Sequence, residues 1–217
     1  FLKLAGGPLS GKPRRYSAPG REAQARRTRA RIVAAAHESF ARHGFAATIR
    51  EVAEAAQVSP ATVELVFGTK AALLDAVVDV ALAGDDEPVP VLERSWVHAL
   101  AEVPAADFLD AMATGFAAGA GRVAPVLAAL DEGSARQPAL EELANRLRRQ
   151  RTTMARWVVG NLTSRSALVS DLTPEEAVET VLVLIDPLLH RRLLVERGWT
   201  VERLATWLGR SMRRLLL

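Results

Sequence analysis

The apolar residues of this chain recur at the spacing of an α-helix from Arg21 to the C-terminus. Ile32, Val33, Ala36 and Phe40 show the pattern, because intervals of three and four residues bring side chains to one face of a helix. No segment shows the two-residue alternation of a half-buried strand. The sequence therefore predicts an all-α protein.

Composition narrows the class of protein further. The chain has 217 residues, of which 49% are hydrophobic and 24% charged, as in a globular protein rather than a disordered one. It has no cysteine, which excludes disulfides, thiolate metal sites and cysteine nucleophiles. The longest run without a charged residue, 111–121, is too short for a membrane-spanning helix, and the first residues lack the apolar core of a signal peptide. We therefore expect a cytoplasmic protein.

The net charge of +3 is distributed unevenly along the chain. Residues 1–31 carry nine basic residues and one acidic residue, whereas residues 71–217 have a net charge of −4. A basic N-terminal part favours contact with a polyanion, because phosphate neutralisation supplies much of the affinity for nucleic acids. The alternative is an arginine-rich helical surface that is merely solvated. Residues 1–20, rich in glycine, proline and basic residues, are predicted to form a flexible basic arm.

Helix start and stop signals divide the next part of the chain into short helices. We expect a first helix over Glu22–Arg42, ended by Gly44, and a second over Thr48–Ala56. A third is expected over Pro60–Phe67, because Ser59 is a good N-cap and proline suits the first helical position. Short helices joined by a tight turn predict a helix-turn-helix, in which the outer face of the last helix is free to enter a major groove.

The candidate DNA contacts lie on the predicted third helix and beside it. We also expect a fourth helix, which Thr69 caps. The candidates on the exposed N-terminal side of the third helix are Ser59, Ala61 and Thr62; those on the helices before and after it are Thr48, Arg50 and Lys70. The alternative is that Ser59 and Thr69 only cap helices and that Lys70 is only solvated.

The stretch around these residues resembles the DNA-binding region of TetR-type transcriptional regulators over about residues 25 to 80. The residues that carry the resemblance are Arg31-Ile32-Val33-Ala34-Ala35-Ala36, Phe40, Gly44-Phe45-Ala46-Ala47-Thr48-Ile49-Arg50-Glu51-Val52-Ala53, Val58-Ser59-Pro60-Ala61-Thr62-Val63 and Phe67-Gly68-Thr69-Lys70-Ala71-Ala72-Leu73-Leu74. Residues 196–208 are also similar to the last helices of many members. The resemblance implies a homodimeric regulator, usually a repressor, whose helical body binds an inducing small molecule and whose C-terminal helices pair the subunits.

The sequence departs from the pattern of that family in three places. The spacing from Gly44 to Ala53 is one residue shorter than usual, so the start of the second helix is expected to be rotated or tightened. Gln57 replaces the usual turn glycine, at a cost on the order of 1 kcal/mol if its backbone is left-handed. Glu64 replaces the usual tyrosine that reaches a phosphate. We expect this carboxylate to weaken DNA affinity; a less favoured alternative is that it accepts a hydrogen bond from cytosine N4.

The body of the chain carries large apolar side chains among many alanines and glycines, which is consistent with a ligand pocket. The candidate pocket residues are Trp96, Phe108, Met112, Phe116, Leu127, Met154 and Trp157. Ordinary core packing explains each of them equally well when it is taken singly. The ligand itself is not indicated.

Two apolar stripes near the C-terminus predict a dimer interface. The candidate interface residues are Val178, Val181, Leu182, Ile185, Leu189, Leu204 and Leu208. The stripes could also be core, but pairing with a twofold partner covers them equally well. We expect an obligate homodimer, whose recognition helices would lie about 34 Å apart and read successive turns of a palindrome.

No enzyme motif is present in the sequence. The four histidines lack metal-ligand spacing, and the chain has no GxSxG, GxxxxGK[ST] or strand-linked GxGxxG segment. We therefore expect no catalytic residue, metal or cofactor. The favoured hypothesis is a TetR-type repressor with a helix-turn-helix domain at residues 21–70 and a ligand-binding and dimerisation domain at 71–217, released from a palindromic operator by a small hydrophobic ligand. The alternative is a ligand-binding or protein-interaction helical dimer with weakened or lost sequence-specific DNA binding.

Overall fold

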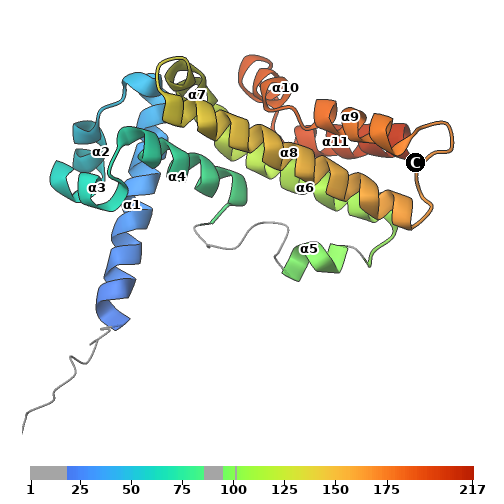
Figure 1. The fold of residues 1–217 in the computed structure, drawn as a ribbon, viewed down its shortest axis with the longest axis horizontal. Coiled ribbons are helices and arrows are strands. Elements are labelled where there is room, and N and C mark those ends of the chain that lie inside the picture. The colour runs from blue at the N-terminus through green and yellow to red at the C-terminus, as the bar shows by residue number, and fades with distance from the viewer. Residues whose placement is uncertain (1–18, 86–94, 101) are drawn as a thin grey trace, which may run out of the picture.

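The computed structural model of the chain describes residues 19–85, 95–100 and 102–217, and this described part contains helices and no strand (Figure 1). The prediction of an all-α protein is therefore confirmed. The helices are α1 (Pro19–His43), α2 (Ile49–Ala55), α3 (Pro60–Phe67), α4 (Lys70–Ala83), α5 (Ser95–Leu100), α6 (Ala105–Val123), α7 (Leu127–Ser134), α8 (Pro138–Ser164), α9 (Pro174–Leu184), α10 (Pro187–Arg191) and α11 (Val201–Leu216). The predicted basic arm lies outside the described residues, apart from its last two, which begin α1.

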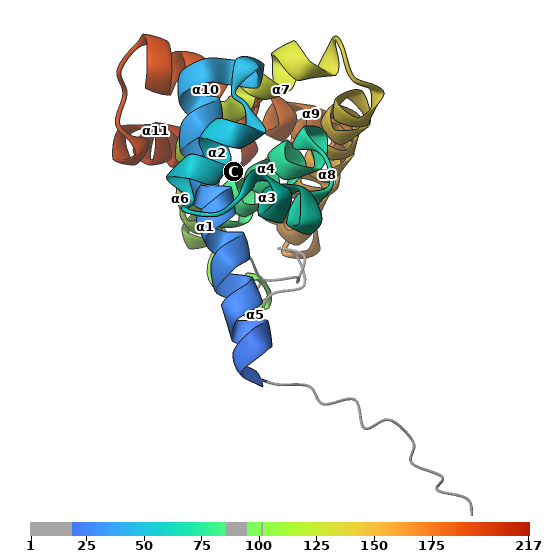
Figure 2. The ribbon, with the colours of Figure 1, turned by 90° about the vertical axis from the view of Figure 1, so that its left-hand side faces the viewer.

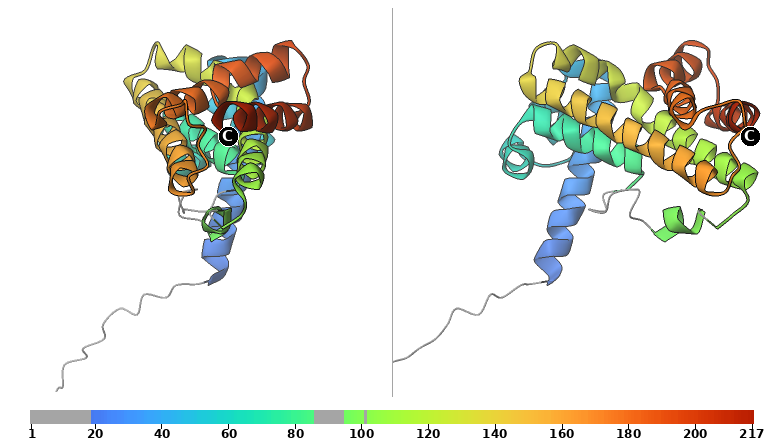
Figure 3. Two further views of the ribbon diagram at one scale, coloured as in Figure 1. Left: turned by 90° about the vertical axis from the view of Figure 1, so that its right-hand side faces the viewer. Right: turned by 45° about the vertical axis from the view of Figure 1, so that its right-hand side comes forward.

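The molecule is elongated, and α1 to α4 form one of its ends (Figure 1). The long helices α6 and α8 both run along the long axis, and α9 and α11 lie at the other end (Figures 1 and 3). Helix α11 packs mainly on α6, and α9 packs mainly on α8. The short helices α2 and α3 are thereby held away from the C-terminal helices.

Side-chain caps explain where the short helices begin. The Thr48 hydroxyl accepts a hydrogen bond from the backbone N–H of Glu51, whose side chain accepts from the N–H of Thr48, so α2 begins with a complete capping box. Ser59 caps α3 in the same sense, and α3 spans the predicted residues. A lost cap costs about 1 kcal/mol, so these local signals fix where the two helices begin, while packing of their buried residues stabilises helices as short as these.

The two backbone departures from the family pattern are accommodated by tight turns. Gly44 has a φ of +57° and begins a 3-10 turn, Gly44–Ala46, that leads directly to Thr48. The short connection expected before the second helix is therefore a tight turn. Gln57 has a φ of +54°, so the turn before α3 does use a left-handed backbone at this residue, at a cost on the order of 1 kcal/mol.

Two main apolar clusters form the core. The first joins α1 to α4 with α7 and the start of α8, and it includes Ile32, Phe40, Val63, Leu73, Leu74, Val77, Leu127, Leu130 and Leu140. The second lies between α6, α8, α9 and α11, and it includes Phe108, Met112, Val158, Leu162, Val181, Leu208 and Met212. The first cluster therefore continues across the predicted domain boundary at residue 70.

The continuous helical stretch Ala105–Ser134 is long and apolar enough, by length and composition, to cross a membrane. The charge-free run 111–121 did not indicate this longer stretch, because a few charged residues interrupt it. Of the 18-residue segment of this stretch that meets the criterion, 56% is buried inside the protein. Such burial is what the core helix of a globular protein shows, and α6 is covered by α11 and α4.

Candidate nucleic-acid interface

The outer face of α3 is the part of the helix-turn-helix available to a groove. Val63 is buried and fixes the inner face of the helix, whereas Ala61 and Glu64 are exposed. Leu65 has 86% of its surface exposed, the largest fraction among the large hydrophobic side chains of the described residues. Figure 2, which views the molecule from the end that carries α3, shows α2 and α3 on the surface. The structure thus presents α3 outward, as a recognition helix requires.

The hydroxyl groups at the start of this face are occupied by helix capping. Ser59 Oγ accepts from the Thr62 N–H at 3.1 Å and lies 2.8 Å from Thr62 Oγ1. Thr48 is engaged in the capping box with Glu51, and its hydrogen bonds lower the pKa of that carboxyl. Ser59 and Thr48 are exposed, so capping does not remove them from the surface. Their contact with DNA stays a prediction.

The two basic candidates beside α3 have different surroundings. Lys70 Nζ donates to the backbone carbonyl of Phe45 and lies 4.2 Å from the centre of that ring. Partial burial lowers the pKa of Lys70, and the charge of Glu51 opposes this shift. Lys70 therefore holds the turn after α1 against the start of α4, while Arg50 is exposed in the first turn of α2.

An arginine of α6 forms polar contacts with the end of α4. No pattern in the sequence indicated these contacts. Arg122 of α6 donates from Nε to the carbonyl of Ala81 at 2.7 Å and from Nη2 to that of Leu82 at 3.2 Å. These carbonyls belong to the last turn of α4, where no further helical N–H is available. In turn, His37 Nε2 of α1 lies 2.7 Å from the carbonyl oxygen of Arg122. Arg122 thus connects α1, α4 and α6.

Two further side chains of the body, from α7 and α8, contact α4 and the turn after α1. Arg146 of α8 forms ion pairs with Asp75 and Asp79 of α4, the second at 3.1 Å. Burial raises the pKa of Asp79, and the charge of Arg146 acts in the opposite direction. Glu132 of α7 accepts from the backbone N–H of Phe45 at 3.0 Å. No local pattern could reveal these contacts, because the partners are far apart in the sequence.

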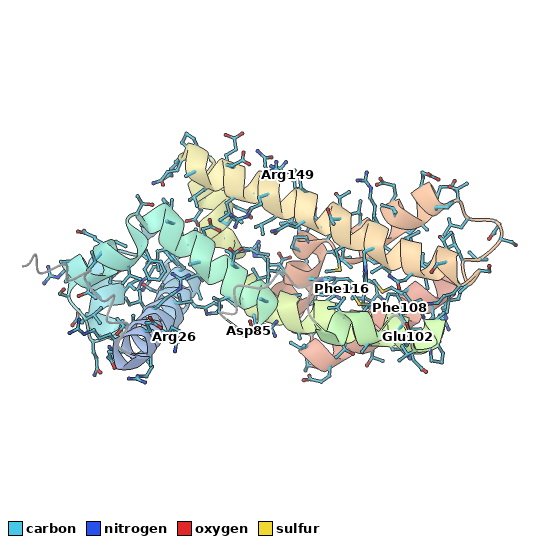
Figure 4. All side chains as sticks on the ribbon, turned by 60° about the horizontal axis from the view of Figure 1, so that its bottom comes forward. Arg26, Asp85, Glu102, Phe108, Phe116 and Arg149 are labelled. Carbon is cyan, nitrogen blue, oxygen red and sulfur yellow. The ribbon has the colours of Figure 1, made fainter. Side chains whose placement is uncertain are left out.

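The structure brings most of the candidate pocket residues together. Phe108 and Met112 are buried in the second apolar cluster, and Phe116, Met154 and Trp157 pack against it. The rings of Phe108 and Trp157 lie 5.5 Å apart, and Figure 4 shows Phe108 and Phe116 along α6. Leu127 is buried in the first cluster instead, and the side chain of Trp96 lies outside the described residues. The position of a ligand pocket stays a prediction.

The candidate interface residues lie largely in the core of a single chain. Those that are buried in it are Val181, Ile185, Leu204 and Leu208. The remaining three, Val178, Leu182 and Leu189, are half-buried. The most exposed apolar side chains of this region are Val183, Leu188 and Val195, none of which was selected from the sequence. A twofold partner would contact these residues first.

Comparisons with known proteins support the helix-turn-helix and the fold. Residues 32–77 match the family described as bacterial regulatory proteins, tetR family. A putative TetR-family regulator from Rhodococcus sp. is 16% identical with a TM-score of 0.65, covering 88% of this chain and 100% of its own. A TetR regulator from Haloarcula marismortui is 18% identical with a TM-score of 0.64, covering 88% and 98%.

A third similar structure contains a ligand. FadR from Bacillus subtilis in complex with stearoyl-CoA is 15% identical with a TM-score of 0.61, covering 84% of this chain and 96% of its own. No curated protein matches the chain. Residues 32–77 therefore belong to the tetR family of bacterial regulatory proteins, and the chain as a whole has the all-helical fold of solved TetR-family transcriptional regulators, as the resemblance implied.

Proposed function

We propose that this chain is a cytoplasmic homodimeric repressor that binds a palindromic operator and leaves it when a small hydrophobic ligand binds the body. The observation that carries the proposal is the exposed outer face of α3 within the tetR-family segment. Ala61, Thr62 and Glu64 lie on α3, and in this proposal they contact bases or the DNA backbone. In this proposal the chain needs no metal or cofactor and catalyses no reaction.

The contacts between body and α4 support release by a ligand. Arg122 holds the end of α4 and Arg146 holds its middle, so a displacement of α6 or α8 would displace α4. Because α3 packs against α4, the recognition helix would move with it. A ligand that favours the displaced state lowers DNA affinity by a population shift, and DNA must weaken ligand binding by the same factor. Long-chain acyl-CoA, found in the similar FadR structure, is a reasonable first compound to test.

The proposal is tested by footprinting and gel shift on the DNA that flanks the gene of this protein. We expect one protected palindrome, bound at least 1000-fold more tightly than a scrambled duplex of equal length, as is typical of specific regulators. Binding that depends steeply on salt but shows no sequence preference would instead support the alternative, a helical dimer that has lost specific DNA binding.

We expect the wild-type chain to be dimeric at micromolar concentration and Val183→Asp to be monomeric. Val183 lies on α9 with 65% of its surface exposed, and an aspartate placed near its own twofold copy adds repulsion and a desolvated charge. The dissociation constant should rise about 100-fold or more, as measured by light scattering. Leu82→Asp, which changes an exposed leucine of α4, should remain dimeric. A monomeric wild-type chain would contradict the dimer.

We expect Glu64→Tyr to tighten operator binding about tenfold. The change removes a negative charge from the outer face of α3 and restores the residue type that reaches a phosphate in the family. The measurement is a fluorescence anisotropy titration at fixed salt. Glu141→Tyr, an exposed position on α8, is the control and should leave affinity unchanged. An unchanged or weaker affinity of Glu64→Tyr would show that the carboxylate does not oppose binding.

A further inference from the structure

The first part of α1 lies outside every site described above. The tetR-family match begins at residue 32, whereas α1 begins at Pro19. Ile32 is also the first buried residue of the helix, with none of its surface exposed. Figures 1 and 2 show α1 extending well clear of the other helices before it reaches them. We call residues Pro19–Arg31 the stalk.

The stalk is strongly basic on all sides. It carries five arginines and one glutamate, and its arginines are Arg21, Arg26, Arg27, Arg29 and Arg31. At 3.6 residues per turn these positions are distributed around the whole helix. Its apolar residues are alanines only, so it has no stripe that could pack on a core or form a coiled coil. It equally lacks the apolar face with which a helix lies on a membrane surface.

The stalk is anchored next to the recognition helix. The guanidinium of Arg29 lies 4.8 Å from the centre of the ring of Phe67, the last residue of α3. This cation–π contact and the burial of Ile32 fix the point at which the stalk leaves the body. The helix from Pro19 to Arg31 is roughly 20 Å long, which equals the rise of about six phosphates along one DNA strand. The stalk therefore leaves the body next to α3, which is the helix proposed to seat the duplex.

We propose that the stalk is a second DNA-contacting surface, which binds the phosphate backbone flanking the groove that α3 occupies. The inference rests on the proposed function, because it takes the duplex on α3 as given. The contact is independent of sequence, since arginines spread around a helix can neutralise phosphates but cannot all face base edges. Each neutralised phosphate contributes about 0.9 to the slope of log affinity against log salt. The stalk therefore extends the bound site beyond the bases that α3 reads.

The test compares two matched double variants. Arg26→Ala/Arg27→Ala removes an adjacent pair of exposed arginines from the stalk, and alanine preserves the helix. Arg148→Ala/Arg149→Ala removes an adjacent exposed pair from α8, and Figure 4 shows Arg26 and Arg149 on separate parts of the molecule. Each variant is titrated between 50 and 200 mM salt against two duplexes. One is the protected operator trimmed to the bases read by α3, and the other adds about 15 base pairs on each side.

We expect the stalk variant to bind the flanked duplex about tenfold more weakly than the wild-type chain at 100 mM salt. The slope of log affinity against log salt should be less steep by about 2. On the trimmed duplex it should bind like the wild-type chain, and the α8 variant should match the wild-type chain on both. Equal affinities of the two variants for the flanked duplex would overturn the proposal. A loss of the same size on both duplexes would also overturn it, because the arginines would then act through α3.

Failure of this inference can be distinguished from failure of the proposed function. If no operator is found, the repressor proposal fails. The stalk proposal can then still be tested by comparing the wild-type chain and the stalk variant on a 40-base-pair duplex of mixed sequence, where the slope of log affinity against log salt is measured. An unchanged slope there would overturn the stalk proposal. A lipid surface is the other possible partner. The stalk proposal would also be overturned if the wild-type chain bound phosphatidylserine vesicles, the stalk variant did not, and both bound DNA equally well. Circular dichroism at 222 nm verifies that both variants remain helical.

Discussion

Replacing Ala61 by glutamate is expected to lower operator affinity about 100-fold or more while leaving the protein folded. Ala61 is exposed at the second position of α3, on the face that would enter the groove. A carboxylate there faces the negative potential of the duplex and loses water without gaining a partner, and such like-charge contacts cost several kcal/mol. The helix itself should tolerate the change, because acidic residues are favourable in the first turn.

The chain offers a closely matched control for this variant. Ala139 is also exposed and also follows a proline at the first position of its helix, α8. Ala139→Glu should therefore have the same effect on stability and no effect on DNA affinity. Anisotropy titrations give the affinities, and thermal melts give the stabilities. Similar DNA affinity for both variants would mean that the outer face of α3 does not contact DNA.

Replacing Phe40 by alanine is expected to destabilise the protein by about 3–5 kcal/mol, as is usual for a large aromatic removed from a core. Phe40 is 1% exposed in the first apolar cluster, where α1 packs against α4. The loss combines the lost burial of the ring with the cavity that it leaves. For a chain of this size the melting temperature should fall by about 10 °C or more.

Leu82→Ala is the control for this prediction, because Leu82 is 41% exposed at the end of α4. We expect a change below about 1 kcal/mol there, since little apolar surface is lost from the core. Differential scanning calorimetry measures both variants. A Phe40→Ala protein as stable as the Leu82→Ala protein would contradict the packing of α1 in this core.

The features that could be predicted from the sequence are those with local causes. The third helix was predicted at its observed residues because Ser59, Pro60 and Gly68 supply a cap, a start and a stop within ten positions. The left-handed backbone that was considered for Gln57, because glycine is usual there, is also present. Periodicity in turn identified which side chains avoid water, and it therefore predicted the fold class.

The partner that covers an apolar face could not be predicted in this way. Leu204 and Leu208 lie on a regular stripe, but the side chains that bury them belong to the same chain, chiefly through packing of α11 on α6. Leu127 joins the first cluster for a similar reason, because spacing does not specify which neighbours a side chain meets. The contacts of Arg122 and Arg146 were missed because an arginine on a helical surface gives no sequence signal of its distant carbonyl or carboxylate partner.

The apolar cluster shared by α1, α4, α7 and α8 limits how this protein can be taken apart. A fragment that ends after α4 would lack the buried side chains of α7 and α8, such as Leu130 and Leu140, that complete this cluster, so it would tend to aggregate. Hybrid regulators that join this DNA-binding segment to the sensing body of another protein would meet the same difficulty. Such hybrids should retain the buried side chains of α7 and the first turns of α8, or redesign both sides of that junction together.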